Sequence, residues 1–252
     1  MFFSNTHTYL IRGRQSLGSV TGLIGACCTP FNVDQMIKRM QSSRSWPRPN
    51  YLQPSVPWEV LNAIGDFPSA LELHSLLMLR EEQPLYARAE LETQICNLCA
   101  VLKTVHEKLI PHIDALALTS SQIITKWENN RDIAARQGTL MHYSCEAFLN
   151  NVRIPERIES STEFKLFRKF LSIMQNLTAY RTEWVIFGDE ERLAGSVDFV
   201  AIEECGDLVI VDWKRSKGMK TTSSLSYGKM MLGPCHSVPD SWPAYSKPTG
   251  IV

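Results

Sequence analysis

Apolar side chains recur at helical spacing between residues 85 and 110. The repeating positions, separated by steps of 4, 3, 4, 3 and 4, are Leu91, Ile95, Leu98, Leu102, Val105 and Leu109. This spacing predicts a long helix with one apolar stripe. Pro84 can open the helix and Pro111 can end it, because proline suits a first helical turn and disrupts a helix interior.

Three other segments, residues 31–44, 120–151 and 161–174, are also predicted to be helical. Asn32 is a candidate N-terminal cap for the first, because its side-chain oxygen can accept a hydrogen bond from the first turn. Gly138 is a candidate break point in the second. The chain therefore has a large helical content.

Residues 180–188, 193–202 and 208–217 have the composition and alternation of β-strands. The five residues EECGD at 203–207 contain a glycine and match an ordinary hairpin loop length. The last two strands are therefore expected to form an antiparallel hairpin. Residues 7–25 are expected to form strand and turn.

Alternation along this hairpin separates an apolar face from a charged face. The apolar face collects Val197, Phe199, Ala201, Val209, Val211 and Trp213. The other face collects Asp198, Asp212 and Lys214. A symmetric register places Asp198 directly across from Asp212, at a Cβ separation of roughly 4.5 to 5.5 Å.

Two facing carboxylates repel each other, so the pair needs either a raised pKa or a cation between them. Oxygen ligands favour Mg²⁺ or Mn²⁺ over zinc. Lys214 then lies two residues from a metal ligand, where its ammonium can orient a water or neutralise developing charge. The alternative is an ordinary Asp–Lys contact on the wet face of an amphipathic hairpin.

His142 and Glu146 lie four residues apart in the predicted helix 120–151 and therefore share one face. Such a helix can deliver a third carboxylate to a metal ion. The alternative is a surface contact between neighbouring turns of the helix.

Four segments in this order resemble the PD-(D/E)XK nuclease superfamily, in its RecB-type branch. They are GTLMHYSCEAFLN (138–150), RTEWVIFG (181–188), LAGSVDFVA (193–201) and VIVDWKRSK (209–217). That branch has a helix with G-T-x-x-H-x-x-x-E, a strand with G-x-x-D and an apolar strand ending in D/E-x-K. The resemblance covers about residues 120–217 and implies an α/β (α+β-like) fold with a restriction-endonuclease-like core, a central mixed sheet flanked by helices.

The resemblance also implies roles for individual residues. Asp198 and Asp212 match the acidic pair that binds metal, and Lys214 matches the catalytic lysine. His142 and Glu146 match the helix residues that complete the metal environment. These matches imply a nuclease that depends on Mg²⁺ or Mn²⁺ and hydrolyses DNA phosphodiesters with metal-activated water, in repair, recombination or replication.

Glu183 matches an acidic residue often found one strand earlier in this branch. The alternative for Glu183 is an exposed strand residue.

Basic residues follow the expected active site. Lys214, Arg215, Lys217 and Lys220 fall within seven positions. Arg215, Lys217 and Lys220 are the candidate DNA-binding residues, because such side chains contact phosphates without regard to base sequence. The alternative is a solvated basic loop.

The sequence departs from the branch in its last residues. Pro248 and Val252 stand where the glutamine and tyrosine of a Q-x-x-x-Y helix are expected. We therefore expect a truncated form, and keep as an alternative a catalytically inactive nuclease-fold protein that serves as a DNA-binding or interaction module. Some members that the chain resembles hold an iron–sulphur cluster with one early cysteine and three cysteines after the core. Only Cys235 follows the core here, so the resemblance implies no cluster. Cys96 and Cys99 are expected to be packing residues of a helix, and the alternative for their C-x-x-C spacing is a zinc site.

The expected organisation has four parts. Residues 1–64 form a leader that packs on the core, 65–118 a helical insertion, 119–217 the nuclease core and 218–252 an irregular tail. The helix at 85–110 is a candidate surface for a protein partner. A third hypothesis for the function is therefore a helical interaction protein organised around this segment.

Composition sets limits on these readings. Lysine plus arginine number 26, as do aspartate plus glutamate, so any DNA contact needs a local basic patch. No apolar run is long enough for a membrane span, and 44% of residues are hydrophobic, which predicts a soluble protein. Seven scattered cysteines without framework spacing favour an intracellular, reducing setting.

Overall fold

The computed structural model describes residues 2–3, 8–11, 13–16, 18–26 and 30–216. The chain divides into two compact units, Asn32–Arg131 and the combination of Met1–Phe31 with Asp132–Val252. The unit formed by Asn32–Arg131 extends beyond the predicted helical insertion at 65–118 on both sides. The predicted tail at 218–252, together with Lys217 and Lys220, lies outside the described residues.

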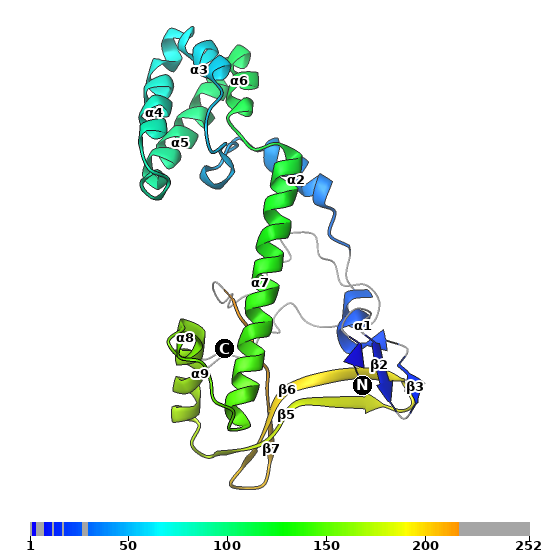
Figure 1. The fold of residues 1–252 in the computed structure, drawn as a ribbon. Helices are drawn as coiled ribbons and strands as arrows, with labels where there is room; N and C mark the ends of the chain where they lie inside the picture. Colours follow the sequence, from blue (N-terminus) through cyan, green and yellow to red (C-terminus); the bar gives the residue numbers. More distant parts are fainter. Residues whose placement is uncertain (1, 4–7, 12, 17, 27–29, 217–252) are drawn as a thin grey trace. The chain divides into compact units, whose positions relative to one another are not determined.

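The second unit is built on a four-stranded mixed sheet. Its strands are β4 (Gly18–Ser19), β5 (Leu177–Gly188), β6 (Leu193–Glu203) and β7 (Leu208–Val211). β6 pairs with β5 and β7 in antiparallel fashion and with β4 in parallel fashion. Figure 1 shows helices against the sheet in this unit. The predicted α/β class, with a mixed sheet flanked by helices, is confirmed.

The predicted hairpin is present, in the expected register. Phe199 pairs with Val211 and Ile202 with Leu208, and Gly206 in the connecting turn has φ 92°. This left-handed conformation favours glycine because a Cβ would be strained there. The second strand ends at Val211, so the prediction that it continues to residue 217 is wrong.

The apolar face of the hairpin forms the core of this unit, as predicted. Phe199, Ala201 and Trp213 are buried and belong to one cluster with three phenylalanines of α9 (Thr162–Ile173). These are Phe164, Phe167 and Phe170. The ring of Trp213 stacks on Phe199 at 5.9 Å between centroids and meets Phe167 and Phe170 edge-on at 5.4 Å.

Helix α7 (Ser120–Leu149) has 30 residues. Its residues up to Arg131 belong to the helical unit, and those from Asp132 belong to the sheet unit. It runs through Gly138 without interruption, so the break considered there does not form. One interior glycine costs only about 1 kcal/mol relative to alanine, which the remaining turns offset. The short α8 (Glu156–Glu159) follows, and Ser161 then caps α9 by accepting a hydrogen bond from the Phe164 amide at 3.2 Å.

The amino-terminal segment forms a second, three-stranded sheet. Its antiparallel strands are β1 (Phe2–Phe3), β2 (Thr8–Ile11) and β3 (Arg14–Gln15). The prediction of strand and turn for 7–25 is wrong at its end, where α1 (Val20–Ala26) is helical. Ser19 Oγ accepts a hydrogen bond from the Gly22 amide at 3.0 Å, which is the N-cap contact that starts such a helix.

The first unit is helical. Its helices are α2 (Val33–Gln41), α3 (Trp58–Gly65), α4 (Leu71–Glu82), α5 (Ala89–Val105) and α6 (Ile110–Ala115). Short 3₁₀ turns occupy η1 (Pro49–Tyr51), η2 (Pro68–Ala70), η3 (Leu85–Ala87) and η4 (Glu107–Leu109). Asn32 caps α2 as predicted, since its Oδ1 accepts from the Gln35 amide at 2.9 Å. No helix in the described part of the chain is long and apolar enough to cross a membrane.

The predicted apolar stripe at 85–110 forms part of the core of the helical unit. Ile95, Leu102 and Leu109 are buried there. The helix is shorter than predicted, because α5 ends at Val105, whose side chain is 65% exposed, and η4 carries Leu109 into the core. The stripe thus predicted burial correctly at Ile95, Leu102 and Leu109, but it failed at Val105 and at the end of the helix.

Cys96 and Cys99 are buried in α5, as predicted, and this burial should protect them from alkylation. Burial raises the pKa of both thiols to about 12, and it has the same effect on Cys145. Because the thiolate is the reactive form, we expect iodoacetamide to label exposed Cys205 much faster than these three in the folded protein. Peptide-resolved mass spectrometry measures this, and equal labelling of Cys99 and Cys205 would contradict the packing described here.

Candidate metal centre

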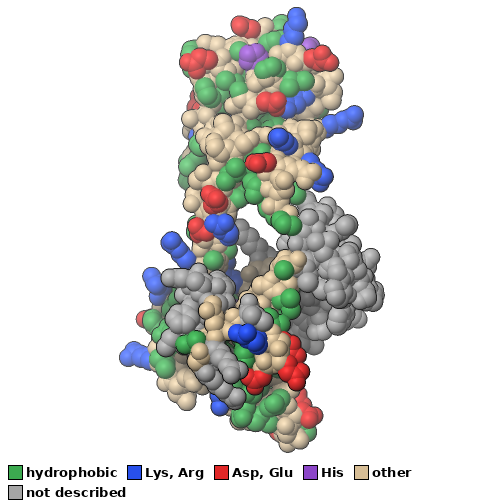
Figure 2. All heavy atoms as spheres, turned by 90° about the vertical axis from the view of Figure 1, so that its right-hand side faces the viewer, with side chains coloured by type: hydrophobic (Ala, Val, Ile, Leu, Met, Phe, Trp, Pro, Cys, Tyr) green, Lys and Arg blue, Asp and Glu red, His purple; other side chains and the backbone are tan. Residues whose placement is uncertain are grey.

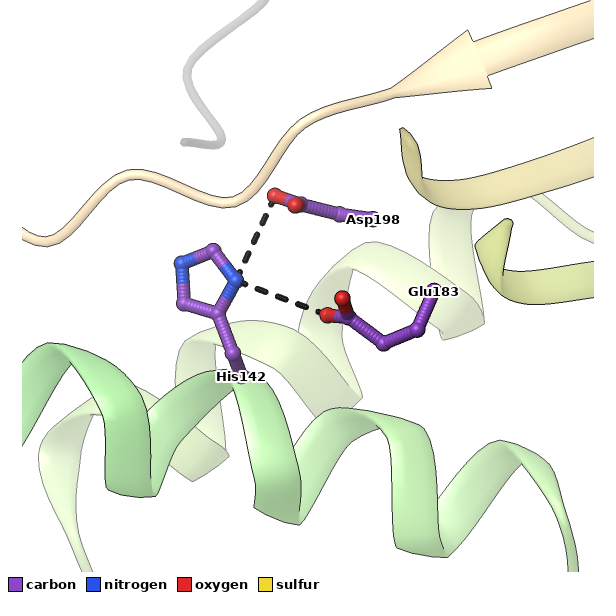
Figure 3. Close-up of side chains that lie close together, drawn as sticks. All are labelled: His142, Glu183 and Asp198. Atoms are coloured by element: carbon purple, nitrogen blue, oxygen red, sulfur yellow. Dashed lines mark ion pairs between the residues drawn. The ribbon is translucent and has the colours of Figure 1, made fainter. Parts of the chain in front are cut away.

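Three side chains from different elements converge in the sheet unit. His142 comes from α7, Glu183 from β5 and Asp198 from β6. Each offers a ligand atom, and these atoms all lie within 4.8 Å of one another. Figure 3 shows the imidazole standing up from the helix toward both carboxylates. We call this set the acid–histidine cluster.

Strand pairing brings the two acids together. Thr182 pairs with Phe199 and Trp184 with Val197, so Glu183 and Asp198 occupy the position between these pairs on adjacent strands. Asn150, just after α7, donates from Nδ2 to Thr182 Oγ1 at 2.9 Å and ties the end of the helix to β5. The cluster is therefore fixed by both the sheet register and a helix–sheet contact.

Glu183 has a backbone conformation that is unusual for a strand. Its φ is 44°, in the left-handed region that favours glycine. A non-glycine residue held there costs of order 1–3 kcal/mol, and such residues are concentrated at functional sites. The surrounding structure therefore holds Glu183 in a conformation that a glutamate does not favour.

Hydrogen bonds hold both carboxylates in place. The Trp213 amide donates to Asp198 Oδ2 at 2.7 Å, and His142 Nδ1 lies 3.4 Å from the same oxygen. Ser196 Oγ donates to Glu183 Oε2 at 3.2 Å. Glu183 Oε1 faces His142 Nδ1 at 3.9 Å. Both acids thus point at one imidazole nitrogen.

The surroundings shift the three pKa values in different directions. Burial by itself raises the pKa of Asp198, but the hydrogen bonds from His142 and the Trp213 amide outweigh burial and lower it. Burial raises the pKa of Glu183, and the charges of Asp198 and Glu146 raise it further. The hydrogen bond to Asp198 raises the pKa of His142. When His142 is protonated, its charge partly neutralises the two acids.

The donor set fits a divalent cation. Two carboxylate oxygens and one imidazole nitrogen suit ions such as Mn²⁺, while Mg²⁺ prefers oxygen ligands throughout. Such an ion would replace the proton of His142 as the positive charge between the acids. Asp198 is the most enclosed of the three, with a side chain 12% exposed, whereas that of Glu183 is 38% exposed. The cluster is therefore open on the Glu183 side.

Asp212 and Lys214 flank Trp213, whose amide donates to Asp198. Asp212 follows the last residue of β7, and its side chain is 55% exposed. Its Oδ2 lies 2.8 Å from Lys214 Nζ, and it is not among the ligand atoms that converge. The Lys214 charge adds a small contribution that lowers the pKa of Asp198, and it partly offsets the rise in the pKa of His142 that the hydrogen bond to Asp198 causes. The charge of Lys214 thus acts on the cluster, while the carboxylate of Asp212 forms an ion pair with Lys214.

The other predicted site residues are placed as follows. Glu146 lies on α7 near Glu183, whose pKa its charge raises, but it is outside the converging set. Arg215 Nε donates to Glu163 Oε1 at 2.8 Å. The pKa of Glu163 is lowered, first by a hydrogen bond from the backbone amide of Glu163 itself and second by the hydrogen bond from Arg215.

Sequence reasoning gave Glu183 a minor place, although it is one of the three converging residues. The sequence could have indicated this role, because the strand predicted at 180–188 precedes the hairpin and can pair with it, which brings Glu183 beside Asp198. Ser196, which orients Glu183, was not considered. A serine two residues before Asp198 on the same strand gives no sequence signal of that role.

Comparisons with known proteins add nothing to this geometry. No family model matches the chain, and no curated protein and no solved structure does so. The assignment of a function therefore depends on the residues themselves.

The raised pKa of His142 predicts a pH-dependent contribution to stability in metal-free protein. Protonated His142 favours the folded state, so this contribution is complete below the ordinary pKa of 6.5 and is lost as pH rises through the raised pKa. We expect the difference in unfolding free energy between wild type and His142→Gln to shrink across that window. Urea denaturation in EDTA at pH values on either side measures it.

The control for this prediction is the same comparison in an Asp198→Asn background. Asp198 is the main cause of the raised pKa of His142. The pH dependence of the difference should therefore nearly disappear in that background. An unchanged pH dependence would mean that another group is responsible.

Proposed function

We propose that the protein is a metal-dependent DNA nuclease that hydrolyses phosphodiester bonds with metal-activated water, using Mg²⁺ or Mn²⁺, on a restriction-endonuclease-like core. The supporting observation is the convergence of His142, Glu183 and Asp198, with the charge of Lys214 close to them. Carboxylates and an imidazole can hold an ion that activates water, and a nearby ammonium can stabilise charge on a phosphate. Roles in DNA repair, recombination or replication are consistent with this chemistry.

The residues divide the work in this proposal. The three members of the acid–histidine cluster would hold the ion, and the bound ion would supply an acidic water and charge stabilisation at the phosphate. Lys214 would neutralise charge that develops on the phosphate oxygens, because it follows the residue whose amide bonds to Asp198 and its charge acts on the cluster. Asp212 keeps that ammonium at the rim through their 2.8 Å ion pair. The Trp213 amide fixes Asp198, so the segment that carries Lys214 also orients a ligand.

DNA contact in this proposal is local and independent of sequence. Lys214 and Arg215 provide two adjacent positive charges beside the cluster, and phosphate groups would bind them. Figure 2 shows acidic and basic side chains interspersed over the helical unit, and acidic side chains gathered on part of the sheet unit. Among the described residues on the face shown there, basic side chains form no continuous surface. In this proposal DNA binds around residues 212–216, because Lys214 and Arg215 lie in that segment.

A second candidate is an inactive nuclease fold that binds DNA or a protein. The observation in its favour is Asp212, whose carboxylate is exposed and paired with Lys214 instead of facing Asp198. In that case the acid–histidine cluster is a structural contact between α7 and the sheet. The two candidates differ in whether cleavage depends on Lys214.

The test is a cleavage assay on linear duplex and single-stranded DNA with Mg²⁺ or Mn²⁺. Lys214→Ala should lower the cleavage rate by about 100-fold or more, as expected for loss of a group that stabilises transition-state charge. Lys169→Ala, an exposed lysine on α9, is the matched control and should cleave like wild type. EDTA should stop cleavage. Absence of cleavage in wild type, or equal rates in both variants, would favour the inactive fold.

A further inference from the structure

A cavity of about 210 Å³ lies between α7, α8, α9 and the segment after β7. It is separate from the acid–histidine cluster, whose three residues do not line it. Its volume is below the roughly 300–1,000 Å³ typical of pockets for drug-sized ligands, so it suits a smaller group. All residues that line it belong to the sheet unit.

The walls of the cavity are mostly apolar. Leu140 and Met141 of α7 face Ile158 of α8 and Phe164 of α9 across it. The Phe164 ring is buried, while Leu140 is 45% exposed, so Leu140 lies toward the solvent. A flat apolar group can fill such a space and displace water from both walls.

The polar side chains that line the cavity include two arginines, a glutamine and a glutamate. Arg157 and Arg215 supply two guanidinium groups, and Gln137 supplies an amide with both donor and acceptor atoms. Glu163 also lines the cavity and pairs with Arg215 through its Oε1 at 2.8 Å. The cavity thus combines apolar walls, a hydrogen-bonding amide and positive charge, which together match a nucleobase with its phosphate.

The position of Arg215 connects this cavity with the acid–histidine cluster. Lys214 acts electrostatically on His142 and Asp198, while the next residue, Arg215, lines the cavity and reaches α9. One short segment, residues 212–216, therefore borders both places. A nucleic-acid strand crossing this segment would present one phosphate to each of two adjacent basic residues.

We infer that the cavity binds one unpaired nucleobase of the DNA strand, with Arg157 and Arg215 holding the attached phosphate. This inference rests on the proposed function and adds a substrate class to it, namely single-stranded DNA or an unpaired strand end. A base within a duplex is stacked and paired and has to leave the helix before it can enter a pocket. A base that is already unpaired enters without that cost. Binding requires Arg215 to exchange the carboxylate of Glu163 for the phosphate.

Binding without cleavage tests this inference. Fluorescence anisotropy in EDTA gives the Kd of wild type for labelled hexadeoxyadenylate and for a blunt duplex, and titration calorimetry gives the Kd for dAMP. Leu140→Trp fills the cavity from its exposed side, and Leu166→Trp is the matched control, since Leu166 is a leucine on α9 outside the cavity with 46% exposure. Arg157→Gln and Arg153→Gln form a second matched pair, in which Arg153 lies outside the cavity.

Leu140→Trp and Arg157→Gln should each weaken hexadeoxyadenylate binding by at least about fivefold, the lower end for loss of one stacked base. Their controls and the affinity for duplex should change by less than about twofold. If dAMP binding weakens in parallel, the cavity takes a free nucleotide as well as a strand, and if dAMP does not bind measurably, it requires the strand. Both results support the inference.

Unchanged hexadeoxyadenylate affinity in both cavity variants would overturn the inference, and so would an equal loss for duplex. These outcomes are distinct from failure of the proposed function. A wild-type protein that does not cleave with any metal contradicts the nuclease but leaves the binding result readable. A protein that cleaves, but binds equally with the cavity filled, contradicts the cavity alone.

Discussion

Replacing Asp198 with asparagine should reduce metal-dependent DNA cleavage by about 100-fold or more. Asp198 is the most enclosed carboxylate of the acid–histidine cluster, and its Oδ2 accepts from the Trp213 amide and faces His142 Nδ1. Asparagine keeps an acceptor oxygen for that amide but removes the negative charge that would bind a cation in the proposed site. The loss should therefore appear in cleavage and metal affinity while the fold persists. Cleavage rates at saturating Mn²⁺ and thermal unfolding by circular dichroism measure the two effects.

Asp207→Asn is the matched control for this variant. Asp207 lies in the turn of the same hairpin and is exposed, and its Oδ2 contacts Cys205 Sγ at 3.3 Å. The substitution removes one negative charge from the same hairpin outside the cluster. Wild-type cleavage in Asp198→Asn, or the same loss in both variants, would remove Asp198 from the proposed mechanism.

Trp213→Ala should destabilise the sheet unit by about 3–5 kcal/mol, the range for removing a large buried aromatic side chain. Trp213 is 6% exposed and contacts the rings of Phe167, Phe170 and Phe199. Its removal leaves a cavity beside three aromatic groups and loosens the segment whose amide holds Asp198. We therefore expect faster amide hydrogen exchange in β6 and α9 and loss of cleavage.

Trp58→Ala is the control, because Trp58 is 63% exposed on α3 in the helical unit. An exposed substitution of this kind usually changes stability by less than about 0.5 kcal/mol. Hydrogen exchange followed by mass spectrometry reports the two units separately, which a single unfolding curve does not. If Trp213→Ala exchanges no faster in β6 than Trp58→Ala does, the aromatic core described here does not hold the sheet unit together.

Local patterns in the sequence were sufficient to predict the hairpin and its buried face. Val197, Phe199 and Ala201 occupy alternate positions and Asp198 falls between them, and a strand has a side-chain period of two. The short loop at 203–207 leaves one natural register, and the observed pairing of Phe199 with Val211 is that register. The stripe with Ile95 and Leu102 likewise placed the correct side chains in the helical core.

The composition of the cluster was not predictable in the same way. The sequence paired Asp198 with Asp212, but β7 ends at Val211 and Asp212 turns to Lys214, so Glu183 is the acid beside Asp198. The residue at which a strand ends depends on what packs on the strand, and the left-handed conformation of Glu183 is set by tertiary structure. Neither the strand end nor this conformation can be predicted from the local sequence.

Helix limits were also set by interactions beyond the local pattern. Gly22 and Gly25 lower the helix propensity of residues 20–26, yet α1 forms there after the Ser19 cap. Val105 fits the apolar stripe but is exposed, because α5 ends with it and the chain turns. Propensity and periodicity identify elements well, and they locate the ends of elements poorly.

The central claim is that His142, Glu183 and Asp198 together bind one divalent ion. X-ray diffraction from crystals soaked in Mn²⁺, measured at the manganese absorption edge, tests it most directly. We predict one anomalous difference peak within coordination distance of His142 Nδ1 and of a carboxylate oxygen from each of Glu183 and Asp198. A structure in which no manganese contacts Asp198 at saturating concentration, or in which manganese binds Asp212 alone, would contradict the claim.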